Sequence, residues 1–404
     1  MTNADDHPIE TYAETVSPRR RALMLGSIVA LNMLALAATD LYLPSVPALP
    51  EILDISLESA QMTLVAFAAG FAISQIFMGA FGDIYSRRAV LGTSVALFVP
   101  ATIACAMAQS ADALIAARFV QGAAGAASAA LTAPLIRTLF EEARAIHAMS
   151  IIGSIDAVIP AFAPILGAWI FITFGWSWNF WLLAIITIPA GIIAFMAMPR
   201  ERPKQGRDLV GALLGYTALL KHPAYMGYAL SHAAALGGFL GLVFSTPALL
   251  RLHMDSGPSA FVGTQILWVG VFLVAAQMTG KLVRRWGADR LIVVGNQLQI
   301  AGGILLVGYT LLAAQPVWWM HALAAVPTCI GLGLRGGAGF ARAIDMMPSH
   351  AARASAFILF ASMAATALCT AAAAPFLETG VWAGAVSVLV MSVVALLLLR
   401  LTRR

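Results

Sequence analysis

Continuous apolar runs recur along the whole chain, and short polar connections separate them. A helix needs about 20 apolar residues to cross the hydrocarbon core of a bilayer, and these runs reach that length. They do not alternate apolar and polar residues with the period of two that membrane β-strands show. The pattern therefore predicts an all-α membrane protein with twelve transmembrane helices, near residues 22–44, 59–81, 89–109, 112–134, 147–172, 178–198, 224–249, 261–283, 289–312, 318–341, 354–375 and 380–400.

Basic residues lie almost entirely in alternate connections between the predicted helices. If the N-terminus is cytoplasmic, the cytoplasmic connections hold the basic residues at 19–21, 87–88, 137, 144, 200–221, 284–285, 290, 342, 353 and 403–404. The outer connections hold almost none, and Arg251 is the exception. Because cytoplasmic loops carry the excess of Lys and Arg, this distribution predicts that both termini are cytoplasmic.

The composition agrees with a membrane protein and also indicates two halves. Hydrophobic residues make up 60% of the 404 residues and charged residues only 11%, whereas soluble domains carry about 25% charged residues. The most polar internal stretch falls between the sixth and seventh predicted helices. We therefore expect a cytoplasmic tail (1–21), a six-helix bundle (22–198), a cytoplasmic linker (199–223) and a second six-helix bundle (224–404).

The two halves carry similar connections at corresponding places. "GAFGDIYSRRAVL" follows the second predicted helix, and "GKLVRRWGADRLI" follows the eighth. Each begins with a glycine at the inner end of a helix and makes a short basic turn into the next helix. Internal repeats of this kind build transporters in which two bundles rock around a central site. The repeat therefore favours a transporter of two pseudo-symmetric bundles.

Three motifs resemble those of the major facilitator superfamily. In the first connection Gly79, Asp83, Arg87 and Arg88 match its Gly-x-x-x-Asp-x-x-x-Arg-Arg pattern, although Ile84 and Ser86 depart from the usual residues. "ARFVQGAAGAASAA" resembles the signature of the fourth helix. "AVIPAFAPILGAWI" resembles the antiporter signature of the fifth helix; it holds Pro160, Pro164 and Gly167, with alanines in place of two glycines.

The first predicted helix narrows the resemblance. Residues 40–44, "DLYLP", resemble the first-helix signature of drug:proton antiporters of the Bcr/CflA type, which include chloramphenicol and florfenicol exporters. The resemblance implies proton-coupled export of phenicol-type or other lipophilic drugs across the bacterial inner membrane by alternating access. We expect no cofactor, and we expect the proton gradient to be the energy source. It also implies that Asp83 contacts the N-terminus of helix 11 and latches one state, although Arg87 and Arg88 also fit plain cytoplasmic anchoring.

Asp40 and Arg118 fall inside predicted membrane spans, where a charge costs at least about 2.5–3.5 kcal/mol and should face a cavity or a partner. From the rise of a helix, both lie in the outer half of the membrane and are able to meet. Burial raises the pKa of a carboxyl group, whereas a nearby arginine lowers it. Asp40 is therefore a candidate for proton exchange. The alternative is an Asp in interfacial water and a snorkelling Arg. Gln121 and Tyr42 are candidate cavity residues beside them.

Three further polar residues interrupt the spans. Asp156 shares a helix face with Pro160 and Pro164. It is either a second protonation site or a residue whose side chain is bonded to the helix backbone. Arg335 lies between glycines in helix 10, where it contacts substrate or Asp156, or snorkels to the cytoplasmic surface. Histidine as a residue type ordinarily titrates near physiological pH, so His232 in helix 7 is a candidate for proton coupling as well as for ordinary packing.

Other functions lack support in the sequence. The basic residues are scattered, which argues against nucleic-acid binding, and Cys105, Cys329 and Cys369 all fall in predicted spans without a metal-binding spacing. We see no Walker A, HExxH or GxSxG motif, so we expect neither an ATP-driven pump nor an enzyme. We expect a monomer in the lipid bilayer that binds protons and a small molecule. The rival hypothesis is proton-coupled transport of an anionic metabolite, such as an organic acid or siderophore, clamped by Arg118 and Arg335.

Overall fold

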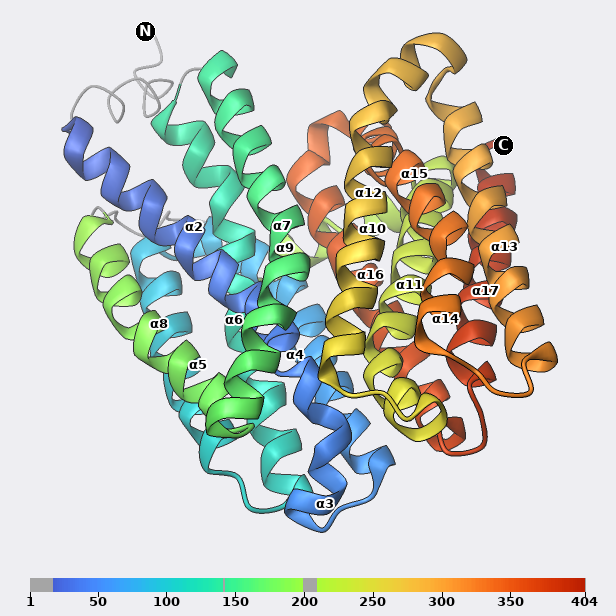
Figure 1. Cartoon of the computed structure of the whole chain (residues 1–404). Coiled ribbons are helices and arrows are strands. Elements are labelled where there is room, and N and C mark those ends of the chain that lie inside the picture. Colours follow the sequence, from blue (N-terminus) through green and yellow to red (C-terminus); the bar gives the residue numbers. More distant parts are fainter. Residues whose placement is uncertain (1–16, 141, 199–208, 404) are drawn as a thin grey trace, which may run out of the picture.

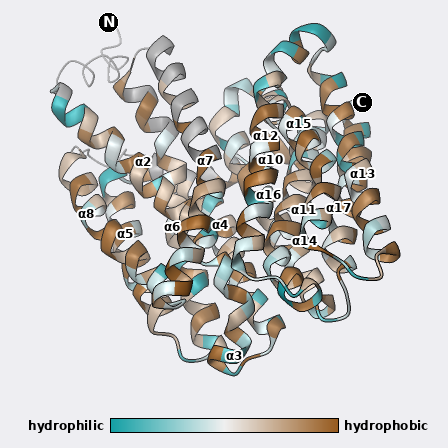
Figure 2. Cartoon of the chain, viewed as in Figure 1, coloured by the Kyte–Doolittle hydropathy of each residue, from teal (hydrophilic) through white to brown (hydrophobic). Residues whose placement is uncertain are grey.

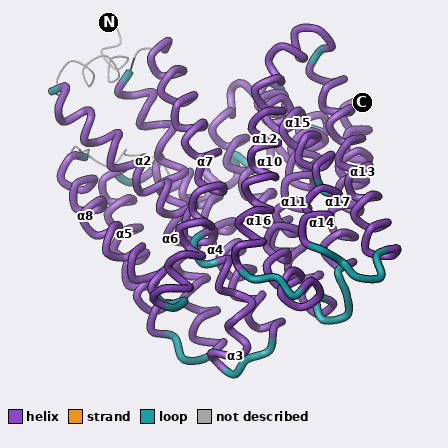
Figure 3. Tube along the Cα trace, viewed as in Figure 1, coloured by secondary structure: helices purple, strands orange, loops and turns teal. Residues whose placement is uncertain are grey.

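The computed structural model describes residues 17–140, 142–198 and 209–403, and this part of the chain is helical with no strand (Figure 3). Both described ends lie at one end of the molecule, here named the termini end, and α3 marks the opposite, far end (Figure 1). The first half contains α2 (Pro18–Asp40), η1 (Leu43–Ala48), α3 (Leu49–Leu53), α4 (Leu57–Ile84), α5 (Arg87–Met107), α6 (Ala111–Leu139), α7 (Glu142–Phe174) and α8 (Trp178–Ala197).

The second half begins with two short helices within the predicted linker, α9 (Leu209–Leu214) and α10 (Thr217–Leu220). Tyr216 lies between them and donates a hydrogen bond to the Ile76 carbonyl of α4, at 3.3 Å. The chain continues with α11 (Pro223–Met254), α12 (Pro258–Trp286), α13 (Ala288–Leu312), α14 (Trp318–Ala324), α15 (Val326–Asp345), η2 (Pro348–His350), α16 (Ala351–Ala373), η3 (Ala374–Phe376), α17 (Trp382–Leu398) and η4 (Leu399–Arg403).

The helices form two bundles that stand side by side, α2–α8 in one and α11–α17 in the other (Figure 1). The bundles meet mainly along two helix pairs, α4 with α16 and α7 with α12. The second helix of each half, α4 or α12, therefore packs against the fifth helix of the other half. This exchange of equivalent partners is the contact pattern that a pseudo-two-fold axis between the halves requires.

Within the described residues, eleven helices are long and apolar enough to cross a membrane, and the apolar segment Val158–Phe174 of α7 fits the remaining predicted span. Hydrophobic colours run along the middle of α5 and α8 (Figure 2). Large apolar side chains are exposed on α7 and α8, among them Phe162, Trp169, Ile172 and Met196. An aqueous surface would not hold so many in one band, so this surface faces lipid.

The first predicted span differs from its helix. The α-helix ends at Asp40, and the chain continues towards the far end as the 3₁₀-helix η1 and then α3. Pro44 and Pro47 lack the N–H groups that would continue the ladder onto the carbonyls of Asp40 and Leu43. Asp40 therefore lies at a helix break within the span and not at its end.

The far end is closed where the bundles meet. The 3₁₀-helix η1 packs against both α11 and α12. One apolar cluster joins Leu43 and Val46 of η1 to Leu250 and Phe261 of the second bundle. Arg251 of α11 donates to the Pro47 carbonyl at 2.9 Å and forms an ion pair with Glu51 of α3. The structure is therefore in a state that is sealed at the far end.

Candidate transport site

Arg118 is the centre of the polar site in the first bundle, and its side chain is completely buried. Its Nη1 donates to Gln121 Oε1 at 2.7 Å and to the Ala38 carbonyl at 3.2 Å, while its Nη2 donates to Thr39 Oγ1 at 3.1 Å. Gln121 donates in turn to Thr102 Oγ1 at 2.9 Å. The network ties α6 to α2 and α5 and leaves Arg118 Nε without a partner.

Aromatic rings complete the surroundings of this cation. The Arg118 guanidinium lies 4.3 Å from the centre of the Phe67 ring, 5.1 Å from that of Tyr42 and 5.7 Å from that of Phe180. The Tyr42 hydroxyl is 2.9 Å from Thr63 Oγ1 of α4. Ring faces attract cations, and the attraction strengthens where water is excluded. The site therefore holds a buried charge by hydrogen bonds and rings instead of by a carboxylate.

Asp40 lies next to this network but outside it. The Arg118 guanidinium binds the backbone of Ala38 and the hydroxyl of Thr39, and it forms no ion pair with the Asp40 carboxylate. The Asp40 side chain is mostly buried and makes no hydrogen bond or ion pair with any described residue. The structure thus brings the two predicted residues together without joining their charges.

Glycines bring the backbones of the site close together. A Cβ on Gly122 of α6 would collide with the Phe67 carbonyl of α4, and a Cβ on Gly70 of α4 would collide with the Phe119 carbonyl of α6. Small residues permit this kind of approach between membrane helices. On α7, a Cβ on Gly167 would collide with the carbonyl of Leu41, directly after Asp40. Gly167 therefore packs against the helix break that carries Asp40.

The remaining residues of the fifth-helix and loop motifs are only partly described. Pro160 and Pro164 lie within α7, and Pro164 is buried. Gly79 and the side chains of Asp83 and Asp156 lie outside what the structure describes. Arg87 and Arg88 occupy the first turn of α5 after the N-cap Ser86, and the Arg88 guanidinium lies 4.1 Å from the Phe195 ring centre of α8. Arg88 therefore packs within its own bundle, and the predicted latch stays a prediction.

The second bundle has its own buried arginine. Arg335 of α15 donates from Nη1 to the Ser231 carbonyl of α11 at 2.9 Å and from Nη2 to Ser231 Oγ at 3.0 Å. His232 is buried beside it, and the His232 ring packs edge-on against Phe340, with centres 5.6 Å apart. The arrangement parallels the first bundle, because in each half an arginine of the fourth helix binds a backbone carbonyl and a hydroxyl of the first helix.

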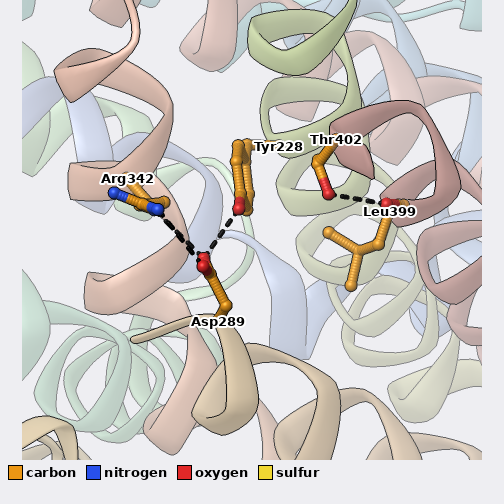
Figure 4. A network of polar contacts seen from close by, with 5 residues as sticks. All are labelled: Tyr228, Asp289, Arg342, Leu399 and Thr402. Atoms are coloured by element: carbon orange, nitrogen blue, oxygen red, sulfur yellow. Dashed lines mark hydrogen bonds and ion pairs between the residues drawn. The ribbon is translucent and has the colours of Figure 1, made fainter. Parts of the chain in front are cut away.

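A polar network ties three helices of the second bundle at the termini end (Figure 4). Asp289, in the first turn of α13, accepts from Arg342 Nε at 3.0 Å and Nη2 at 3.2 Å, and from the Tyr228 hydroxyl at 2.6 Å. This forked contact gives the pair a defined geometry. Asp289 belongs to the repeated connection "GKLVRRWGADRLI", so here the repeat supplies a tie within one bundle, between α11, α13 and α15.

Comparisons with known proteins place this geometry in a family. Residues 28–370 match the Major Facilitator Superfamily. The chain belongs to this superfamily. The transporter has the expected all-α fold of two pseudo-symmetric six-helix bundles, and it is a multi-pass membrane protein. Solved structures share the fold: a bacterial homolog of the human lysosomal transporter Spinster, inward-facing and unoccupied (TM-score 0.69, 16% identity, 96% of each chain covered), and an auto-inhibited POT family peptide transporter (TM-score 0.71, 14% identity, 96% of each chain covered).

Relatives of the transporter carry names from drug resistance. It is 27% identical to a bicyclomycin resistance protein homolog of Haemophilus influenzae over 69% of this chain and 70% of the relative. It is 27% identical to a chloramphenicol resistance protein of Pseudomonas aeruginosa, over 80% of this chain and 74% of the relative. It is 24% identical to the multidrug resistance protein MdtL of Shigella dysenteriae, over 92% of this chain and 93% of the relative. The resemblance to the drug-exporter group of the superfamily is confirmed.

Several residues of the transporter's site gave no signal in the sequence. Thr39, Thr102 and Ser231 bind or orient the two arginines, yet hydroxyl residues are common in apolar helices, where they usually bond to the preceding turn. Phe180 approaches Arg118 from a distant helix, so no spacing along the chain links them. Thr39 is the one residue that adjacency to Asp40 would have suggested.

Proposed function

We propose that this transporter exports small lipophilic drugs, phenicols among them, across the bacterial inner membrane in exchange for protons, with both termini in the cytoplasm. The observation that carries the proposal is the position of Asp40, a carboxyl group with no partner in the described part of the chain. It lies at a helix break inside the membrane, one residue from the Thr39 hydroxyl that binds Arg118. The drug-resistance names of its relatives support the choice of cargo.

The chemistry follows from the contacts of Arg118. The guanidinium is held by neutral groups in this state, so it is available to the Asp40 carboxylate once that group loses its proton. Protonation of Asp40 from outside and deprotonation towards the cytoplasm would switch Arg118 between Thr39 and Asp40. Because Thr39, Asp40 and Tyr42 lie close together where α2 ends, this switch couples the proton to the site that Tyr42 and Gln121 line for cargo. We propose that it works as a monomer.

This function requires that the proton gradient drives the movement of the drug. Cells that overproduce the transporter should accumulate less chloramphenicol than cells with an empty vector, and a protonophore should remove the difference. In everted vesicles with an acidified lumen, addition of drug should release protons from the lumen. No difference in accumulation across a panel of neutral and cationic lipophilic drugs would contradict the proposal.

One observation favours a second cargo class. Arg118 and Arg335 are both buried, and neither forms an ion pair with a described carboxylate. Two such cations fit proton-coupled transport of an anionic metabolite, such as an organic acid or siderophore. The same cells, given labelled organic acids in place of drugs, distinguish drug export from transport of an anionic metabolite. Gradient-driven movement of an acid without any drug export would favour transport of the anionic metabolite.

A further inference from the structure

Arg335 is a buried cation with no counter-charge among the described residues. Its side chain is 1% exposed, and both of its hydrogen bonds in this part of the chain go to one residue, Ser231. A guanidinium has five N–H donors, and Arg335 Nε has no partner among the described residues. Burying an unpaired charge costs several kcal/mol, so such a group is expected where an occupant of opposite charge completes it.

A second unpartnered nitrogen faces the same point. His232 Nδ1 is buried and has no hydrogen-bond partner among the described residues. The two groups meet at Gly339: a Cβ built there would lie 3.6 Å from Arg335 Nη2 and 3.8 Å from His232 Nδ1, with no other atom among its nearest neighbours within 4 Å. The position of this Cβ is thus within reach of both nitrogens, and the glycine places no side chain there.

We propose that Arg335, His232 and Gly339 form a binding site for a carboxylate group of the cargo. A carboxylate carries the single negative charge that offsets one arginine, and its two oxygens match the flat guanidinium fork. The His232 imidazole contributes one more donor in the tautomer that carries the proton on Nδ1. His232 packs against Phe340. Phe340 and Ile76 of α4 both pack against the same apolar cluster, so the site lies beside the surface where the two bundles meet.

The inference rests on the proposed function in one respect, that cargo passes between the bundles, and it extends the cargo beyond neutral phenicols to lipophilic molecules that carry an acid group. Arg118 differs from Arg335 in this respect. Three rings and three hydrogen bonds to three different residues already surround Arg118, whereas the surroundings of Arg335 are incomplete. The carboxylate is therefore assigned to the second bundle.

Isothermal titration calorimetry on the purified full-length transporter tests the site with three probes at neutral pH: benzoate, its neutral counterpart benzamide, and chloride. Benzoate should bind at least about tenfold more tightly than benzamide and chloride, because only benzoate combines an apolar ring with a forked charge-assisted contact. Equal affinity for benzoate and benzamide would overturn the proposal, and so would chloride binding as tightly as benzoate, which would indicate a simple inorganic anion site.

Two matched variants locate the binding. Gly339→Ala places a methyl group beside both nitrogens at ordinary contact distance, so the protein should fold while benzoate affinity falls at least about tenfold. Gly336→Ala, on the same helix, meets no atom within 4 Å and should bind benzoate like the parent. Unchanged affinity in Gly339→Ala would refute the assignment. The titration uses no proton gradient, so a failure of drug export and a failure of this site are separate outcomes.

Discussion

Removal of Arg251 should open the far end of the transporter. Arg251 is the only arginine predicted in an outer connection, and the structure shows it joining the two bundles there through Pro47 and Glu51. An exposed ion pair contributes about 0.2–1 kcal/mol. The charge-assisted bond to the Pro47 carbonyl adds about 1.5 kcal/mol, the low end of its range, since Arg251 is 38% exposed. The sum is about 2 kcal/mol, or roughly 30-fold in the ratio of closed to open states.

Cysteine labelling measures this ratio. Ala248 is completely buried next to Leu57 of the other bundle, and the three native cysteines are all buried. In purified protein carrying Ala248→Cys, the substitution Arg251→Ala should speed maleimide labelling by roughly 30-fold where opening limits the reaction. Arg285→Ala, an exposed arginine at the termini end, is the control and should leave the rate unchanged. A labelling rate within twofold of the parent in Arg251→Ala would refute the reasoning.

Three further substitutions test the packing and the polar networks. Gly167→Ala forces a methyl group onto the Leu41 carbonyl and should destabilise the protein by about 1–3 kcal/mol in thermal unfolding, whereas Gly308→Ala, which meets no atom within 4 Å, should not. Arg118→Lys keeps the charge but loses the fork that binds three acceptors; drug export should fall at least about tenfold at normal protein level, and parental export would contradict the site. Asp289→Asn removes the forked ion pair with Arg342 and should lower the unfolding free energy by about 1 kcal/mol with export retained; an unchanged unfolding temperature would show that the tie contributes nothing.

The spans and the two halves could be predicted from the sequence because lipid restricts a polar backbone to long apolar helices. The helix break at Asp40 was harder to predict. Pro44 and Pro47 were visible in the sequence, but η1 and α3 continue the span beyond the break, and this continuation depends on their packing against the second bundle.

The candidate site could be predicted in part. Arg118 and Asp40 could be identified because a charge in an apolar membrane helix is costly and usually has a function. Their similar depths follow from helix geometry. The acceptors that the Arg118 guanidinium binds depend on side-chain positions. Here it donates to Thr39 and Gln121 instead of to Asp40. The parallel between Arg118 and Arg335 was hidden for the same reason, since it lies in their partners and not in their spacing.

Proton movement in proteoliposomes tests the central claim most directly. The transporter is reconstituted with a pH-sensitive dye inside, and chloramphenicol is added under a pH gradient. Parent protein and Asp54→Asn, which alters an exposed far-end Asp in a left-handed conformation that Asn also adopts, should both show drug-dependent proton flux. Asp40→Asn should show none while remaining folded. Proton flux of parental size from Asp40→Asn would contradict the claim that this carboxyl group carries the exchanged proton.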